Sequence, residues 1–278
     1  MRIEFTKMHG LGNDFVVINN LSRAISLSGE NIRFIADRHL GVGCDQLLLI
    51  EPARNPENDF SYRIFNADGG EVEQCGNGAR CFTRYVYDRG LTDKKAISME
   101  TLGGVITGHI EQDNQVRVDM GTPVFEPGQI PFSAEAEAET YELEALGNSW
   151  NISAVSMGNP HAVLVVDNVD AAPVNTLGPE IEHHARFPQR VNVGFMQVID
   201  NSHIRLRVFE RGAGETQACG TGACAAVVTG IRRGLLENNV QVSLQGGDLL
   251  INWDSRNNNN NVWLTGPTTY VFEGVIEL

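Results

Sequence analysis

One stretch of this chain occurs twice, and that repeat limits the possible folds more than any other feature. Residues 63–79 read RIFNADGGEVEQCGNGA and residues 207–223 read RVFERGAGETQACGTGA. The two align without a gap at an offset of 144 residues, and eight of the seventeen positions are identical. Other blocks repeat at offsets of 143 to 146, for example HGLGNDFVVIN (9–19) with SMGNPHAVLVV (156–166). Because this period is too long for a solenoid, the repeat predicts two homologous domains.

The domain junction is predicted near Gly121, in a segment rich in proline and glycine. We expect an N-terminal domain over residues 1–120 and a C-terminal domain over 121–264, with 265–278 returning to the first domain as a final strand. The tract NNNNN at 257–261 predicts a solvated hairpin loop. Stretches rich in Val, Ile and Phe predict strands at 15–19, 46–50, 116–120, 162–166, 204–209 and 240–244.

Each repeated cysteine precedes a segment that is predicted to be helical, at 77–88 and at 221–233. The second contains GTGACAAVVTGI, which carries no charge, and a helix that is apolar on all sides is normally buried. A short helix enclosed by strands predicts an α+β fold, in which each domain is a mostly antiparallel strand barrel wrapped around a central helix. Two further helices are predicted, at 29–39 and at 179–185, the latter beginning with a proline in its first turn.

Charge and composition exclude several classes of function. The chain has 278 residues and a formal net charge of −14, so we expect no binding to nucleic acid or to anionic lipid. The N-terminus lacks the features of a signal peptide, and no apolar run reaches the roughly 20 residues that span a bilayer. We therefore expect a cytoplasmic protein. The five cysteines are an odd number without the spacing of a zinc site, so we expect neither a disulfide framework nor a bound metal.

Cys75 and Cys219 lie at equivalent helix starts, which is a favourable position for a reactive thiol. An ordinary thiol has a pKa of about 8.5, and a helix start can lower it by about one to five units. Glycines at 76, 78, 220 and 222 are expected to leave backbone amides open to an anion. If the two thiols face one carbon atom, one sulfur can remove a proton while the other donates one. The pair predicts a racemase or epimerase that needs no cofactor.

The other three cysteines lack this context. Cys44 has no repeated counterpart in the chain, and Cys81 and Cys224 are not followed by a Gly-x-Gly sequence. A single buried cysteine usually acts as a small hydrophobic residue. We therefore interpret Cys44, Cys81 and Cys224 as packing residues.

The longer motifs resemble one known family. KMHGLGNDFVVIN, GVGCDQLLLI, FNADGGEVEQCGNGARCF, MGNPHAV, VNVGF and FERGAGETQACGTGACA together are similar to the diaminopimelate epimerase family. The resemblance implies an isomerase, independent of pyridoxal phosphate, that converts LL-2,6-diaminopimelate to the meso form. That reaction belongs to lysine and peptidoglycan-precursor biosynthesis. It also implies the diaminopimelate epimerase-like fold and a homodimer.

The resemblance assigns roles to individual residues. It implies that Cys75 and Cys219 are the acid/base pair. It places Tyr270 at a dimer interface and makes His161 and Glu210 important for activity. The implied substrate-binding residues are Asn13, Gln46, Asn66, Gly76, Asn77, Asn159, Asn192, Glu210, Arg211, Gly220 and Thr221.

The substrate's chemistry supports two of these assignments separately. Diaminopimelate carries an amino acid at each end, so its distal end needs a cation for the carboxylate and an anion for the ammonium. Arg211 and Glu210 are adjacent and can supply both, since arginine binds a carboxylate bidentately. Which thiol is the base depends on the epimer that is bound, and the sequence leaves this open.

Two alternatives remain at this stage. The first is another enzyme on the same duplicated fold, such as a proline-type racemase, which also has paired cysteines. A phenazine-type isomerase is disfavoured because it lacks that pair. The second is a redox-sensing protein in which the two thiols form a disulfide as a functional state. Turnover of proline would indicate the former, and activity of the oxidised protein the latter.

Overall fold

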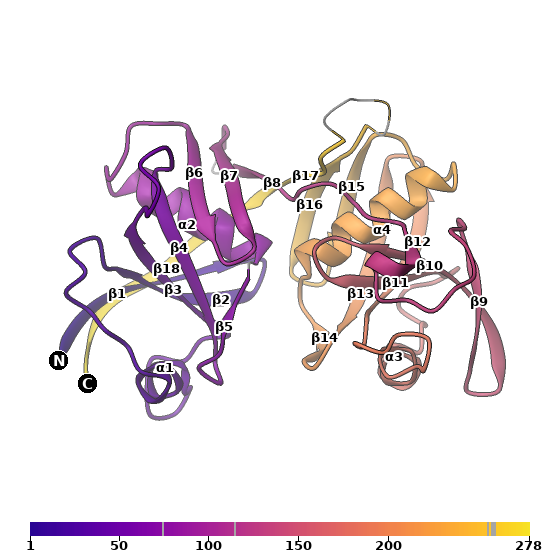
Figure 1. Cartoon of the computed structure of the whole chain (residues 1–278), viewed down its shortest axis with the longest axis horizontal. Helices are drawn as coiled ribbons and strands as arrows, with labels where there is room; N and C mark the ends of the chain where they lie inside the picture. Colours follow the sequence, from indigo (N-terminus) through magenta and orange to yellow (C-terminus); the bar gives the residue numbers. More distant parts are fainter. Residues whose placement is uncertain (74, 114, 255, 257–259) are drawn as a thin grey trace. The chain divides into compact units, whose positions relative to one another are not determined.

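A computed structural model describes residues 1–73, 75–113, 115–254, 256 and 260–278 (Figure 1). The chain divides into two compact units, residues 1–119 with 265–278 and residues 120–264. The tract predicted to form a hairpin loop lies partly outside the described residues. No helix among the described residues has the length and apolar character needed to cross a membrane.

In the first unit most strands are hydrogen-bonded side by side in one sheet. Along the sheet the order is β18, β1, β2, β3, β4, β6, β7 and β8, with the short β5 paired to β4. Pairs β2–β3 and β4–β6 are parallel, and the others are antiparallel. The elements are β1 (Arg2–Gly10), β2 (Asn13–Asn19), α1 (Gly29–Ala36), β3 (Gln46–Pro52), β4 (Phe60–Asn66), β5 (Glu71–Val72), α2 (Gly76–Asp88), β6 (Ala96–Thr101), β7 (Gly104–Ile110), β8 (Gln115–Asp119) and β18 (Thr269–Glu277).

The second unit repeats this topology. Its strand order is β9, β10, β11, β12, β13, β15 and β16, with the short β14 paired to β13. Here too two pairs are parallel, β11–β12 and β13–β15, at positions equivalent to those in the first unit. The elements are η1 (Pro127–Gln129), β9 (Tyr141–Ala145), β10 (Asn148–Ser156), β11 (Pro160–Val165), α3 (Val174–Glu182), β12 (Asn192–Asp200), β13 (His203–Glu210), β14 (Gly214–Thr216), α4 (Gly220–Arg232), β15 (Asn239–Leu244), β16 (Gly247–Asn252) and β17 (Trp263–Pro267), which continues into the first unit.

Each unit encloses one helix, as the apolar sequence of the second copy predicts. In α4 every residue from Gly222 to Gly230 is buried, and this helix contacts β10, β11, β12, β13 and β16 (Figure 1). In α2 the buried run extends from Gly76 to Thr83 and contacts β1, β2, β3, β7 and β8. The prediction of a mostly antiparallel barrel around a central helix is therefore confirmed.

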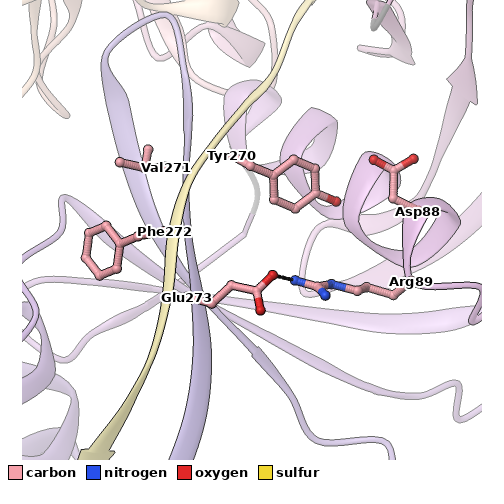
Figure 2. A pocket seen from close by; sticks show the side chains of 6 residues that line it. All are labelled: Asp88, Arg89, Tyr270, Val271, Phe272 and Glu273. Carbon is pink, nitrogen blue, oxygen red and sulfur yellow. Dashed lines mark hydrogen bonds and ion pairs between the residues drawn. The ribbon is translucent and has the colours of Figure 1, made fainter.

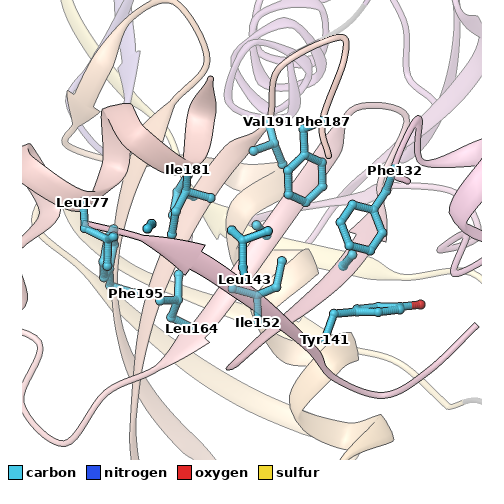
Figure 3. Close-up of a cluster of buried hydrophobic side chains, with 14 of the residues drawn as sticks. Phe132, Tyr141, Leu143, Ile152, Leu164, Leu177, Ile181, Phe187, Val191 and Phe195 are labelled. Carbon is cyan, nitrogen blue, oxygen red and sulfur yellow. The ribbon is translucent and has the colours of Figure 1, made fainter. Parts of the chain in front are cut away.

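A second apolar layer lies between each barrel and its outer helix. In the second unit α3 contributes Leu177 and Ile181, which pack with Phe195 and Leu164 from the strands (Figure 3). In the first unit Ile32 and Ile35 of α1 pack with strand residues in the same way. The spacing of these side chains at three to four residues explains why both segments are helical.

The limits of the two outer helices differ from the predicted ones. The helix that was predicted over 29–39 ends at Ala36, because the carboxylate of Asp37 accepts hydrogen bonds from the next backbone N–H groups and stops the turn. The prediction that the other helix begins with Pro179 is wrong. It begins at Val174 after Pro173, and Pro179 lies inside it. The buried Val174 and Leu177 favour the earlier start, since they continue its apolar face.

Candidate active site

In both units the repeated cysteine is the residue immediately before the enclosed helix. Cys75 and Cys219 are the N-cap residues of α2 and α4, and both have extended backbone angles. The first helical residues are Gly76 and Gly220, so each helix begins one residue earlier than predicted. Each sulfur therefore lies where the unpaired N–H groups of a helix begin.

The second glycine of each motif has a packing role that the sequence analysis did not predict. A Cβ atom on Gly78 would lie 2.4 Å from the hydroxyl oxygen of Tyr62. A Cβ atom on Gly222 would lie 3.0 Å from Val208 and 3.2 Å from the sulfur of Cys219. A side chain would therefore clash at Gly78 and be crowded at Gly222, because neighbouring side chains lie close to the helix at both positions.

The first unit brings three of the predicted residues together at Cys75. Its thiol donates to Oδ1 of Asn13, with sulfur and oxygen 3.5 Å apart, and the amide of Asn77 donates to the same oxygen at 3.3 Å. The hydroxyl of Tyr62 donates to the carbonyl oxygen of Cys75 at 3.4 Å. Tyr62 is a contact that the sequence analysis missed, since nothing in the motif marks it.

Gln46 and Asn66 form a second group in the same unit. They are directly opposite each other on β3 and β4, and Nε2 of Gln46 donates to Oδ1 of Asn66 at 2.9 Å. The buried Oε1 of Gln46 has no hydrogen-bond partner within the described parts of the chain.

A cluster of charged side chains holds the amide of Asn13 in place through Asp45. Asp45 accepts a hydrogen bond from the amide of Asn13 at 3.2 Å. Arg38 bridges Asp45 and Asp14, and Lys7 contacts Asp14 at 2.6 Å. Burial alone would raise the pKa of Asp14, but the hydrogen bonds from Arg38 and Lys7 hold it well below its usual value. The cluster fixes Asn13, and the sequence analysis did not predict it because its members are distant along the chain.

In the second unit a chain of hydrogen bonds leads to Cys219. Nε2 of His161 lies 3.0 Å from Oδ1 of Asn159, the amide of Asn159 donates to Thr221 at 3.3 Å, and the Thr221 hydroxyl lies 3.6 Å from the sulfur. Since Oδ1 can only accept, His161 carries its proton on Nε2. Burial, and then the charge of Arg211, lower the pKa of His161 to about 3, so the ring is neutral at pH 7.

The surroundings of Cys219 oppose ionisation in this state. The backbone N–H of Gly222 donates to the sulfur at 3.4 Å, which favours the thiolate. Burial, reinforced by the negative charge of Glu210, nevertheless raises the pKa of Cys219 well above that of an ordinary thiol. The expectation of a lowered pKa at this helix start is therefore wrong for Cys219, because loss of hydration outweighs the N–H donors.

The remaining predicted residues of the second unit lie at the ends of neighbouring strands. Asn192, beside His161 in the sheet, accepts from the backbone N–H of Arg211 at 3.0 Å. The guanidinium of Arg211 donates to a loop carbonyl, that of Gln189, at 3.1 Å. Glu210 accepts a hydrogen bond from the hydroxyl of Thr216, a residue that the sequence analysis missed.

The three cysteines interpreted as packing residues are buried in the two cores. Burial raises the pKa of Cys44 to about 11 and that of Cys81 to about 12, so neither is reactive near neutral pH. Over the residues that the structure describes, histidine, cysteine and acidic side chains form no cluster of three that could hold a metal ion.

The fold places the chain among duplicated-barrel proteins that include amino-acid epimerases. A hydroxyproline epimerase from Agrobacterium vitis matches with a TM-score of 0.71 at 15% identity, over 99% of this chain and 91% of its own. A phenazine biosynthesis protein from Bacillus anthracis matches with a TM-score of 0.68 at 17% identity, over all of both chains. Similarity at this level of identity shows a shared fold only.

Sequence comparison identifies the family within that class. The model of the family described as "Diaminopimelate epimerase" matches residues 5–126 and 153–271. A diaminopimelate epimerase from Nitrosospira multiformis is 63% identical over 278 residues, covering 100% of this chain and 99% of the relative. One from Nitrosomonas eutropha is 59% identical over 281 residues, covering all of both proteins. The chain belongs to the diaminopimelate epimerase family.

Proposed function

We propose that this isomerase interconverts LL-2,6-diaminopimelate and meso-2,6-diaminopimelate, with Cys75 and Cys219 as the acid/base pair. The family and its 63% identical relative support the substrate. The observation that carries the mechanism is the thiol at the N-cap of the enclosed helix in both repeats. This step supplies meso-diaminopimelate for lysine and peptidoglycan-precursor biosynthesis.

The reaction is an inversion at one α-carbon. One cysteine, as thiolate, removes the α-proton, so the carbon–hydrogen bond breaks and a sulfur–hydrogen bond forms. The other cysteine, as thiol, donates its proton to the opposite face. N–H groups at the starts of α2 and α4 bind the adjacent carboxylate and stabilise the charge that develops on it. The balance of protons and electrons requires no oxidant, and we propose that the reaction uses no cofactor.

The surroundings of Cys219 favour one starting protonation state. Because burial and Glu210 raise its pKa, Cys219 holds its proton in the substrate-free protein and is ready to act as the acid. The substrate's ammonium group can neutralise Glu210, which removes one of the charges that oppose the thiolate. Cys219 can then act as the base when the other epimer is bound.

Polar residues around each thiol are proposed to bind the rest of the substrate. Gly76, Asn77, Gly220 and Thr221 at the helix starts hold the reacting end. Arg211 binds the distal carboxylate bidentately, and Glu210 binds an ammonium group. The amides that complete the site are Asn13, Gln46, Asn66, Asn159 and Asn192.

His161 is proposed to act on Cys219 through other residues. Its neutral ring and Asn159 hold the Thr221 hydroxyl beside the sulfur. A charged imidazolium is not needed, since the low pKa of His161 keeps the ring neutral over the working range.

We propose a homodimer formed through β18. Tyr270, Val271 and Phe272 are consecutive and are 37%, 53% and 48% exposed. With Asp88 and Arg89 they line a hollow of about 420 Å³ (Figure 2). Exposed apolar side chains beside a hollow suit a second copy of the chain.

Sedimentation tests this association. Wild type is expected to be a dimer at micromolar concentration and Val271→Asp a monomer, because the introduced charge would be buried without a partner. Val105→Asp, at an exposed position of β7 in the same unit, is the control and is expected to remain dimeric. A monomeric wild type would contradict the homodimer.

We also propose a cytoplasmic location, because the mechanism needs both sulfurs as thiols and the cytosol keeps cysteines reduced. Oxidation that joins the two thiols is expected to abolish activity, and a reductant is expected to restore it. Activity that persists in the oxidised protein would favour the redox-sensing alternative.

Solvent deuterium incorporation tests the reaction itself. Purified protein without pyridoxal phosphate is incubated with LL-diaminopimelate in D₂O, and deuterium at the α-carbon is followed by mass spectrometry. Cys75→Ala and Cys219→Ala should each lower turnover by about three orders of magnitude or more, whereas Cys224→Ala, a core substitution, should retain it. Turnover of proline with none of diaminopimelate would overturn the substrate assignment.

A further inference from the structure

An arginine–glutamate pair occurs at the same place in both repeats. In the first unit Arg63 of β4 binds Glu71 of β5 bidentately, with nitrogen–oxygen distances of 2.7 and 2.8 Å. In the second unit Arg207 of β13 binds Glu215 of β14 bidentately, at 2.6 and 2.8 Å. Both pairs obey the repeat offset of 144 residues. None of these four side chains is among the residues proposed above to contact the substrate.

Each pair joins a long strand to the short strand that leads to the cysteine. β5 is two residues long and β14 is three, so each has few backbone hydrogen bonds of its own. In both repeats the glutamate lies four residues before the cysteine. A shift of either short strand would therefore move the N-cap residue and its sulfur directly.

The second pair is also the centre of a larger network. Besides Arg207, Glu215 accepts hydrogen bonds from Asn175 of α3 at 3.1 Å and from Gln245, in the turn after β15, at 2.8 Å. Arg207 donates as well to the backbone oxygen of Val169 at 3.1 Å. Residues from β13, from α3 and from the turn after β15 thus meet at the carboxylate that precedes Cys219.

The first pair has fewer partners. Arg63 lies 3.9 Å from Glu51 of β3, and its guanidinium stacks over the ring of Phe65, 4.9 Å from the centroid. The turn between β4 and β5 is held to α1 by a hydrogen bond from Arg33 to the backbone oxygen of Asp68 at 3.1 Å. The two ion pairs have the same bidentate geometry, but the residues that contact them differ between the two units.

Partial burial makes these pairs stronger than ordinary surface pairs. The side chains of Arg207 and Glu215 are 18% and 14% exposed, and those of Arg63 and Glu71 are 32% and 24% exposed. The hydrogen bonds from Arg207 lower the pKa of Glu215. Bidentate geometry also restricts orientation, which a point charge such as lysine cannot do.

We propose that Arg63–Glu71 and Arg207–Glu215 are positioning pairs, each of which holds the sulfur of its own half in the geometry for proton transfer. The proposal rests on the two-thiol function proposed above. The pairs act through the backbone of β5 and β14 and do not touch the substrate. Loss of one pair should affect mainly the thiol that follows it.

Kinetics provide the first test. Glu71→Gln, Glu215→Gln and Arg207→Met should lower kcat by about 10- to 100-fold while KM changes less than about threefold, since misplacement of a reacting group slows the chemical step more than binding. Arg205→Met is the matched control. Arg205 lies on β13, as Arg207 does, and forms a bidentate pair with Asp170, which is not part of β14. It should change kcat less than about twofold, and a loss equal to that of Arg207→Met would overturn the proposal.

Alkylation of the thiols provides the second test. If the pairs only stabilised the fold, the loss of one pair would affect the alkylation rates of both cysteines alike. The rate of carboxamidomethylation by iodoacetamide is measured for each cysteine as a function of pH, using peptide mapping. Glu71→Gln should change the profile of Cys75 and leave that of Cys219, and Glu215→Gln should do the reverse. Equal changes at both thiols, or none at either, would contradict the proposal.

Two further comparisons separate positioning from loss of the fold. Circular dichroism and thermal unfolding identify variants that do not fold. If Arg207→Met is one of them, the isosteric Glu215→Gln carries the test. The double variant Arg207→Glu with Glu215→Arg restores an ion pair in the exchanged order. Its kcat should be at least about tenfold higher than that of Arg207→Glu alone. A folded double variant without this recovery would count against positioning. The alkylation test needs no substrate, so its result is independent of the proposed substrate.

Discussion

Cys75 and Cys219 occupy equivalent positions, but different side chains surround them. Cys75 donates to Asn13, which a charged cluster on the same unit holds in place. The sulfur of Cys219 is adjacent to the hydroxyl of Thr221, and the negative charge of Glu210 adds to burial in raising the pKa of this thiol. The duplication supplied two thiols in equivalent positions, and the residues that contact each of them differ.

The carboxylate of Glu210 provides a test at this scale. In a Cys75→Ala background, Glu210→Gln should lower the pKa of Cys219, because it removes the negative charge that disfavours the thiolate. Alkylation of Cys219 by iodoacetamide at pH 8 should then become at least about threefold faster. A rate that is unchanged or slower would show that Glu210 does not control the ionisation of this thiol.

His161 gives a second test. Because its pKa is about 3, its titration should be absent from the pH dependence of kcat/KM between pH 6 and 8. His161→Gln can still donate to Asn159 and should lose less activity than His161→Leu, which we expect to lose about 10- to 100-fold. Equal activity of the two variants, or a changed pH profile in His161→Gln, would contradict a neutral positioning role.

At the scale of elements, close packing around the enclosed helix determines the shape of each barrel. In the first unit Gly108 of β7 lies against Thr83 of α2, whose hydroxyl donates to the carbonyl oxygen of Ala79 at 2.8 Å. A Cβ atom on Gly108 would lie 2.0 Å from that hydroxyl oxygen. The strand can approach the helix only because residue 108 has no side chain.

Substitution of this glycine tests the packing. Gly108→Ala should lower the free energy of unfolding by about 1–3 kcal/mol, the usual cost of overpacking a core. Gly103→Ala, in the turn of the same hairpin, should change it by less than about 0.5 kcal/mol, because its Cβ atom would be 3.4 Å from the nearest atom. Urea unfolding measures both, and equal effects would contradict the close contact.

At the scale of the whole molecule, the chain is acidic and several of its carboxylates depend on basic partners. Asp14 is one example, with a side chain that is 16% exposed and lies between Arg38 and Lys7. A carboxylate whose pKa is lowered by folding stabilises the protein above its unfolded pKa of about 4, and this contribution is lost as the pH falls below that value. Acid should therefore destabilise the protein through such groups.

The variant Asp14→Asn tests the contribution of this carboxylate. Its Tm should be lower than that of wild type at pH 7, and the difference should narrow towards pH 3, since the carboxylate of the unfolded wild-type chain becomes protonated there while that of the folded protein stays ionised. Asp93→Asn, at an exposed position of the same unit, should leave the Tm nearly unchanged at both pH values. A difference for Asp14→Asn that is constant with pH would mean that its charge is not responsible.

Sequence reasoning predicted most of the architecture because the repeat and the apolar periodicity are local signals. The enclosed helix α4 was predicted from a run without charge, and the strands around it from their Val, Ile and Phe content. The start of α3 was predicted wrongly. Proline is frequent in the first turn of a helix, which favoured Pro179, and only contacts with strands far along the chain favour a start at Val174. Within each half the structure brings some of the site residues that the motifs indicated into contact, such as Asn13 with Cys75 and Asn159 with Thr221, and their roles remain proposals.

The sequence by itself determined the family, the duplication and the two N-cap thiols, because identity, period and helix-start chemistry can be read along the chain. Only the tertiary structure decided that Gly78 and Gly222 are packing positions and that Cys219 keeps its proton. It alone also revealed the ion pairs that hold β5 and β14. The physical reason is that burial, charge pairing and close contact depend on residues that are far apart in sequence and meet only when the chain has folded.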